Sequence, residues 1–165
     1  MASADATIEH HEFLFTETGC PDGALIDALR RMMPRSGSIV SWNKSFEMTI
    51  NRRLAERNPA AAAFLTDLNA RMVDLMDVFA SQAFIHPNFK GSNSIKAVLP
   101  VLVPALSYKE LEIQEGGSAS DAWNKIVTDQ LTAADVETTR QSLLKYCGLD
   151  TRAMWEIWLR LQREL

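Results

Sequence analysis

Residues 37–47 set the expected architecture, and they read Gly37-Ser38-Ile39-Val40-Ser41-Trp42-Asn43-Lys44-Ser45-Phe46-Glu47. The segment Ser38–Trp42 is short, β-branched and aromatic, a composition that predicts a buried strand. Asn43 then opens a helix, whose apolar stripe is Phe46, Ile50 and Leu54 and whose end is marked by Asn58-Pro59. Because functional side chains of α/β proteins gather where strands end, we expect this junction to position the site.

Helical patterns dominate the rest of the chain. A helical period over Ala24–Met33 and an Ala-rich run over Ala60–Leu68 predict two helices beside the junction. Residues 71–79 fit either a continuing helix or a short extended piece. Further helices are expected around Ile95–Leu99, after a Gly116-Gly117 turn with a capping box at Ser118 and Asp121, and from near Ala133 almost to the end. The prediction is a helix-rich α/β fold with a small sheet, in a single domain covering residues 1–165.

Composition excludes several classes of protein. The 165 residues are 47% hydrophobic and 23% charged, too apolar for a disordered chain. A net charge of −4 argues against a protein that coats nucleic acid by charge alone, although a bound metal can supply positive charge locally. The two cysteines, Cys20 and Cys147, form no zinc motif and are expected as free thiols in a reducing cytoplasm. The sequence shows neither a secretory signal nor a transmembrane run, so we expect a cytoplasmic protein without a membrane partner.

Glu47 is the first candidate site residue. It falls in the first turn of the helix that follows the strand, where the helix dipole stabilises a carboxylate by about 0.3–1 kcal/mol. That effect explains the residue structurally, and Asn43 is equally explained as an N-cap. The functional interpretation is that the strand delivers the acid to its carboxyl end, where sites of α/β proteins lie.

Asp74 and Lys96 each have a structural and a functional interpretation. If residues 71–79 are helical, Asp74 shares a solvated face with Asp67 and Arg71; if they are extended, Asp74 caps the next helix. Lys96 follows the polar run Gly91–Ser94. It contacts a phosphate in the functional interpretation and is a solvated surface lysine in the structural one.

Asp150 interrupts the apolar stripe of the last helix, which reads Leu143, Cys147, Met154, Ile157 and Leu161. Tyr146 lies one turn earlier on the same face. A carboxylate on the buried side of a helix costs free energy unless it is paired, hydrogen-bonded or bound to a cation. The structural alternative is a bond to a helix N-terminus or to an arginine in the core.

Two of these features together resemble the motifs of DEDD exonucleases. The run Asn43–Glu47 is similar to their second motif, a strand followed by Asn-x-x-Phe-Asp, with Glu47 in place of the usual Asp. Tyr146-x-x-x-Asp150 is similar to the third motif of the Tyr-containing branch. Those enzymes also carry Asp-x-Glu on the first strand of the sheet, and no such pair precedes Asn43. The resemblance therefore implies a truncated RNase H-like fold, in which this chain begins after the first strand.

Nearly the whole chain, from His11 to Leu161, resembles a bacterial family of domains of unknown function that we associate with this exonuclease superfamily. Its members look like parts of longer proteins, and the resemblance does not establish their activity. The resemblance rests on Gly37–Val40, Phe46-Glu47, Arg71–Leu75, His86-Pro87, Gly91–Pro100, Leu106–Tyr108, Tyr146-Cys147 and Asp150–Met154.

The resemblance implies metal-dependent phosphodiester hydrolysis of nucleic acid by the full-length protein. Glu47 and Asp150 would be ligands of Mg²⁺ or Mn²⁺, Tyr146 would position the attacking water, and Asp74 would support the site. Asn43 and Lys96 would contact nucleic acid. Because half of the acids are missing, we expect no metal on this chain and no activity from it alone.

Two expectations concern partners and function. The alternative to a nuclease core is a non-catalytic module, on the same fold, that binds nucleic acid or another protein. A missing first strand would also leave a sheet edge exposed, and exposed edges pair with other chains, so a homodimer through that edge is expected.

Overall fold

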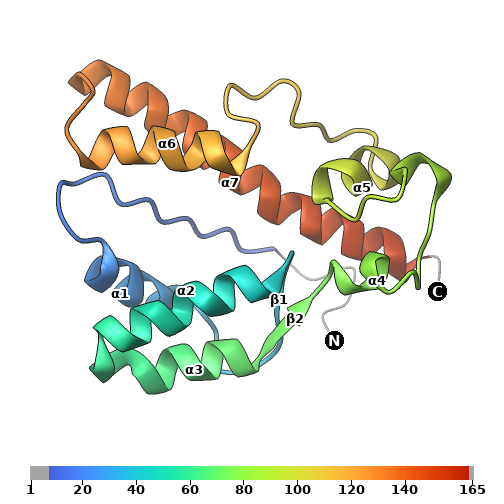
Figure 1. The fold of residues 1–165 in the computed structure, drawn as a ribbon, viewed down its shortest axis with the longest axis horizontal. Coiled ribbons are helices and arrows are strands. Elements are labelled where there is room, and N and C mark those ends of the chain that lie inside the picture. Colours follow the sequence, from blue (N-terminus) through green and yellow to red (C-terminus); the bar gives the residue numbers. More distant parts are fainter. Residues whose placement is uncertain (1–7, 164–165) are drawn as a thin grey trace. The chain divides into compact units, whose positions relative to one another are not determined.

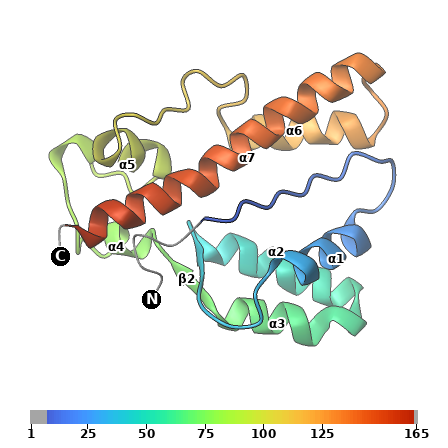
Figure 2. The same cartoon turned by 180° about the vertical axis from the view of Figure 1, so that it is seen from behind.

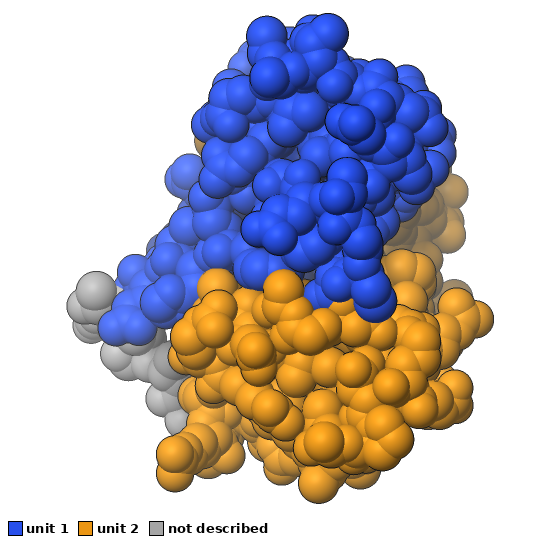
Figure 3. Space-filling view, turned by 90° about the vertical axis from the view of Figure 1, so that its left-hand side faces the viewer, with its two compact units in different colours: residues 1–21, 107–165 blue, residues 22–106 orange. Residues whose placement is uncertain are grey.

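A computed structural model describes residues 8–163 of the chain. These residues form two compact units, coloured separately in Figure 3. One unit contains residues 22–106, and the other contains the described residues on either side, 8–21 and 107–163. The predicted single domain over residues 1–165 stays a prediction.

The unit of residues 22–106 is a small α/β arrangement, visible in Figure 1. Its strands have the burial pattern expected of a sheet that is covered on one side. Its elements are α1 (Asp22–Met32), β1 (Ile39–Ser41), α2 (Lys44–Arg57), the 3-10 helix η1 (Pro59–Ala61), α3 (Ala62–Ala70), β2 (Met72–Asp74), α4 (Asp77–Ala80), the 3-10 helix η2 (Pro87–Phe89) and α5 (Ile95–Leu102).

The sheet of this unit pairs β1 and β2 in parallel, with Val40 opposite Val73 and Ser41 opposite Asp74. A strand is thus confirmed within the predicted segment 38–42, but the prediction that it is buried was wrong at Val40, which is 42% exposed. The undecided segment after Arg71 is extended. The register places the carboxyl ends of both strands side by side. Consequently Asp74 lies beside the start of α2, although 30 residues of chain separate it from Lys44.

The core of this unit is built by three helices. Ile26 of α1, Leu54 of α2 and Leu65 of α3 form one buried cluster together with Ala61 and Leu68. The helical periodicity of these segments was sufficient to predict all three helices. In addition, Arg57 donates from Nε and one Nη to the two carboxylate oxygens of Asp22, at 2.6 and 3.0 Å. This bidentate pair joins the end of α2 to the beginning of α1.

The other unit consists of an extended N-terminal segment and two helices, α6 (Gly116–Val127) and α7 (Ala133–Gln162). Figures 1 and 2 show α6 lying along the first half of α7. The indole of Trp123 donates to the carbonyl of Phe15 at 2.8 Å, which fastens the N-terminal segment to α6. The Thr132 side chain accepts from the Asp135 N–H and caps α7.

The buried face of α7 differs slightly from the predicted one. Its buried residues are Leu143, Tyr146, Ala153, Ile157 and Leu161. Cys147, which we assigned to the stripe, is exposed. The face follows the row through Tyr146 because an aromatic ring has more apolar surface to bury than a thiol.

Two helices differ from their predictions. Gly116 and Gly117 are the first residues of α6, where we expected a turn and a cap at Ser118. The helix expected around Ile95–Leu99 continues through Pro100 to Leu102 as α5. The outcome for the two glycines has a physical reason, since backbone freedom permits a turn without requiring one.

Among residues 8–163, no helix combines the length and the apolar composition needed to span a bilayer.

Candidate functional site

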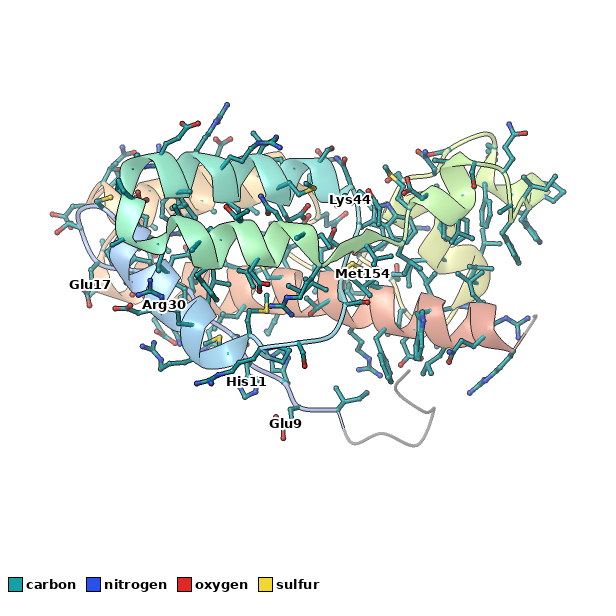
Figure 4. All side chains as sticks on the ribbon, turned by 90° about the horizontal axis from the view of Figure 1, so that it is seen from below. Glu9, His11, Glu17, Arg30, Lys44 and Met154 are labelled. Carbon is teal, nitrogen blue, oxygen red and sulfur yellow. The ribbon has the colours of Figure 1, made fainter. Side chains whose placement is uncertain are left out.

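The candidate site in residues 22–106 is the junction of β1 and α2. Asn43 has φ 67° and ψ 59°, a left-handed conformation that turns the chain sharply from the strand into the helix. The turn directs the N–H groups of Asn43 and Lys44 at the carboxylate of Asp74, at 2.9 and 2.8 Å. Figure 4 labels Lys44 at this end of α2. The junction is therefore closed by a carboxylate from the neighbouring strand.

Asp74 performs the capping that we assigned to Asn43. The Asn43 side chain makes no capping bond to α2; its Oδ1 accepts from the hydroxyl of Ser45 at 2.6 Å. Asp74 also accepts from the N–H of Met76 at 3.1 Å, just before α4. Of the two interpretations of Asp74, the extended one is correct, but the helix that Asp74 caps is α2, not the next helix along the chain. Only 8% of Asp74 is exposed, and three backbone donors satisfy its charge.

Glu47 lies in the first turn of α2, and one of its oxygens has no partner. Two buried side-chain atoms without a hydrogen-bond partner are found among the described residues, Glu47 Oε2 and Ser41 Oγ, and both belong to this junction. Burial raises the pKa of the Glu47 carboxyl, its own backbone N–H lowers it, and the nearby charge of Asp74 raises it further. Such an acid gains by binding a cation or a hydrogen-bond donor.

The second candidate site surrounds Asp150 on α7, in the other unit. The phenol of Tyr108 donates to Asp150 Oδ1 at 2.6 Å, and the ring centroid of Tyr108 lies 6.1 Å from that of Tyr146. Both tyrosines are buried, at 7% and 8% exposure. Asp150 is therefore hydrogen-bonded beside two buried tyrosines, and the donor of this bond is a phenol rather than the helix N-terminus or arginine that we considered.

The carboxylate of Asp150 changes the acidity of its neighbours. Burial, the charge of Asp150 and a hydrogen bond to it raise the pKa of Tyr146 to about 12. Burial and the hydrogen bond to Asp150 raise the pKa of Tyr108 even more strongly. Both phenols are consequently neutral donors at neutral pH, and neither serves there as a base.

Sequence reasoning missed Tyr108. It lies in the loop before α6, and no periodicity connects it to Asp150. An indirect sequence signal for Tyr108 did exist, because a buried carboxylate needs a hydrogen-bond donor. The chain has two tyrosines, and we considered only Tyr146 as a site residue.

The structure brings some of the predicted site residues together. Asn43 contacts Asp74, the charge of Asp74 acts on Glu47, and Tyr146 lies beside Asp150. Lys96 lies on the exposed first turn of α5, where α5 begins at Ile95. Glu47 belongs to one unit, whereas Tyr146 and Asp150 belong to the other, so their predicted convergence stays a prediction.

The donor set fits a divalent ion in part. Carboxylate oxygens are the ligands that Mg²⁺ and Mn²⁺ prefer, and Glu47 offers a buried one without a partner. Asp74 does not fit, because its oxygens are occupied by backbone N–H groups. In the part of the chain that the structure describes, no three His, Cys, Asp or Glu side chains are grouped closely enough to hold a metal.

Comparison with known proteins gives a family but no activity. The chain is 29% identical over 147 residues to the protein "Uncharacterized protein UU173" of Ureaplasma parvum serovar 3, an alignment that covers 79% of this chain and 21% of that protein. The chain thus spans about a fifth of the length of this curated relative. No solved structure matches it. Residues 1–94 match the family described as "Domain of unknown function (DUF2779)", and the chain belongs to that family.

Proposed function

We propose that this chain is the core of an exonuclease-like nuclease domain on a truncated RNase H-like fold. The complete protein would hydrolyse phosphodiester bonds of nucleic acid with Mg²⁺ or Mn²⁺. The observation that carries the proposal is the unpartnered, buried oxygen of Glu47, located where a strand of a parallel pair passes into a helix. Asp74 accepts three backbone hydrogen bonds, whereas Glu47 Oε2 accepts none. This difference supports a role for Glu47 as a metal ligand.

The residues have separate roles in the proposal. Glu47 and Asp150 supply carboxylates to the metal, which when bound stabilises charge on the transferring phosphoryl group. Tyr146 orients the attacking water through its hydroxyl, as a neutral donor and acceptor, because its pKa of about 12 keeps it protonated. Asn43 and Lys96 contact the nucleic acid. Asp74 positions Glu47 by fixing the first turn of α2.

The isolated chain is expected to be inactive. Two carboxylates do not neutralise two divalent ions, and Asp74 is occupied by backbone donors. The missing acids would come from an Asp-x-Glu strand upstream of Met1. We therefore expect no metal on this chain and a complete site only when that strand is present.

A non-catalytic module that binds nucleic acid or another protein is the second candidate. One observation favours it: Asp150 already has a structural partner, since its Oδ1 accepts the phenol of Tyr108 at 2.6 Å. In this alternative the Tyr-x-x-x-Asp pattern persists because it holds the interior of its unit together. Binding of single-stranded DNA without cleavage, by the extended form as well, would support it.

The homodimer is part of the proposal and concerns the sheet. Among the described residues, β1 and β2 pair only with each other, so the sheet has an edge at each strand. Exposed edges pair with strands of other chains, so a homodimer through one of these edges is expected. Sedimentation equilibrium of the chain tests this expectation, and a monomer would contradict it.

The deciding experiment is a nuclease assay with Mn²⁺ and single-stranded DNA. It compares this chain with a form extended at its N-terminus by the upstream coding sequence. We expect metal-dependent hydrolysis by the extended form alone, and its loss in Asp150→Ala. Strong metal-dependent activity of the short chain that survives Asp150→Ala would contradict the site, and so would an upstream sequence without Asp-x-Glu.

A further inference from the structure

A cavity of about 390 Å³ lies in residues 22–106, and its lining residues Phe79 and Asn93 contact Trp42 at the junction of β1 and α2. It is formed by the segment from α4 to the start of α5. Its size is within the range of about 300–1,000 Å³ that small-ligand sites occupy. The side chains that matter for its chemistry are Phe79, Gln82, Phe84, His86, Phe89 and Asn93.

Aromatic rings form the walls of this cavity. Phe79 and Phe89 meet edge to face, with centroids 5.7 Å apart and planes at 84°, and both rings are buried. Phe84 lies 6.0 Å from Phe79 and 6.2 Å from Phe89 and is only half-buried. The result is a fixed aromatic floor with one accessible ring beside it.

The floor is anchored from outside the cavity. Trp42 stacks on Phe79 with centroids 5.4 Å apart, and its indole N–H donates to the carbonyl of Asn93 at 3.2 Å. These contacts hold two walls of the cavity in place without a ligand. Preformed walls of this kind reduce the entropic cost of binding.

Polar groups at the rim indicate what the rings would hold. Gln82 and Asn93 place amides among the lining residues, and none of the lining residues that the structure describes carries a carboxylate. A cation cage is disfavoured by Lys90, an exposed positive charge between the lining residues Phe89 and Gly91. The lining favours a neutral, planar heterocycle as ligand. Its face would stack on an aromatic ring, its polar edges would bond to the amides, and a negative group attached to it would lie near Lys90.

Two residues of this segment have unusual backbone conformations. Gln82 has φ 61° and Lys90 has φ 52°, and both lie in the left-handed region that residues other than glycine rarely adopt. Strain of this kind is common where a loop is shaped around a ligand. Here Gln82 lies between the lining residues Phe79 and Phe84, and Lys90 directly follows Phe89.

We propose that this cavity binds a base of single-stranded nucleic acid, stacked on the half-buried ring of Phe84, with Lys90 near the adjoining phosphate. The choice of nucleic acid as ligand rests on the proposed function. The site is distinct from the candidate metal ligands, because none of Glu47, Tyr146 and Asp150 lines the cavity. The cavity would bind the nucleic-acid strand, and hydrolysis would take place at the metal ligands.

The test is binding of a short fluorescent single-stranded oligonucleotide to the 165-residue chain, measured by anisotropy. The variant Phe84→Leu keeps an apolar side chain and removes the stacking face. We expect it to weaken binding by roughly 5- to 150-fold, as replacement of a stacking residue does. Phe13→Ala, which removes a partly exposed aromatic ring in the other unit, is the control and should leave binding unchanged.

An abasic oligonucleotide of equal length separates stacking from charge. It should bind the chain weakly and be insensitive to Phe84→Leu. Equal binding of the abasic strand, no binding of either strand, or an unchanged affinity of Phe84→Leu would overturn the proposal. So would a free mononucleotide that binds as tightly as the strand. The chain could show base-dependent binding while its extended form shows no nuclease activity. That result would support the base-binding cavity and contradict the proposed nuclease function.

Discussion

The two candidate sites treat their acids differently. At the junction of β1 and α2, Asp74 receives three backbone N–H groups, whereas Glu47 retains a buried oxygen with no partner. On α7, Asp150 accepts the phenol of Tyr108 and raises the pKa of Tyr146 to about 12. At the junction, one carboxylate (Asp74) is fully hydrogen-bonded and a second (Glu47) has a buried oxygen without a partner. On α7, the carboxylate of Asp150 is hydrogen-bonded to Tyr108.

The contrast between Asp74 and Glu47 gives a criterion that separates structural from functional carboxylates. Burial alone does not do so, because Asp74 is among the most buried polar residues and is fully used by the backbone. The useful criterion is whether the surrounding groups already satisfy the charge. By that criterion Glu47 is the stronger ligand candidate, and Asp150 is the residue whose function most needs testing.

Removing the structural acid should have the largest effect. Asp74→Ala leaves the N–H groups of Asn43, Lys44 and Met76 without their acceptor. We expect a loss of about 2–3 kcal/mol in the free energy of unfolding, measured by urea denaturation. Asp27→Ala, at an exposed position on α1, is the control and should change it by less than about 0.5 kcal/mol. Equal effects of both variants would contradict the capping role.

Removing the partner of Asp150 should have an intermediate effect. Tyr108→Phe deletes a hydrogen bond to a carboxylate, which contributes about 1.5–3 kcal/mol when charged groups take part. A double-mutant cycle with Asp150→Ala, which removes both acceptor oxygens, should return a coupling energy of about 1 kcal/mol or more from urea denaturation. Additive effects of the two substitutions would mean that the bond contributes nothing.

The same cluster predicts an alkaline limit to stability. The folded pKa of Tyr146 is about 12, above its unfolded value, so the neutral phenol is favoured in the folded state. The stabilisation is complete below about pH 10 and is lost as the pH rises through the folded pKa. Ultraviolet titration of the chain's two tyrosines measures this, because denatured protein should ionise near the ordinary pKa. Ionisation of both near about pH 10 in the folded protein would contradict the geometry around Asp150.

The smallest effect on stability should come from the unsatisfied acid. Because burial raises the folded pKa of Glu47, ionisation penalises the folded state at neutral pH, and the penalty disappears as the pH falls through that pKa. Glu47→Gln should therefore stabilise the chain at neutral pH, by at most about 1 kcal/mol after allowance for solvent. The gain should vanish in mildly acidic buffer. A marked destabilisation at neutral pH would show that Glu47 has a partner.

Local patterns predicted the helices well and the contacts poorly. The helix α2, its end at Asn58-Pro59 and the long α7 were all visible in the sequence, because each depends on residues a few positions apart. The apolar stripe predicted for α2 was wrong at Phe46, which is 64% exposed, whereas Leu54 is buried. Segment 71–79 was undecided, since three residues of strand have no period and exist only because β1 pairs with them.

The site residues show the same limit. Glu47 and Asp150 stood out in the sequence as acids beside apolar stripes, yet their partners were invisible there. Asp74 reaches the start of α2 across the sheet, and Tyr108 reaches Asp150 from 42 residues away. Those contacts are set by tertiary packing, which spacing along the chain does not encode.

The most direct test of the account is the Mn²⁺-dependent hydrolysis of single-stranded DNA by the N-terminally extended protein carrying Glu47→Gln. We expect a rate at least about 100-fold below that of the unsubstituted protein, with a urea midpoint that is equal or slightly higher. Glu47→Asp, which keeps the carboxylate, should restore much of the rate, and Glu56→Gln, an exposed acid of α2, should not change it. An active Glu47→Gln protein would contradict the claim that the fold keeps this acid for a metal.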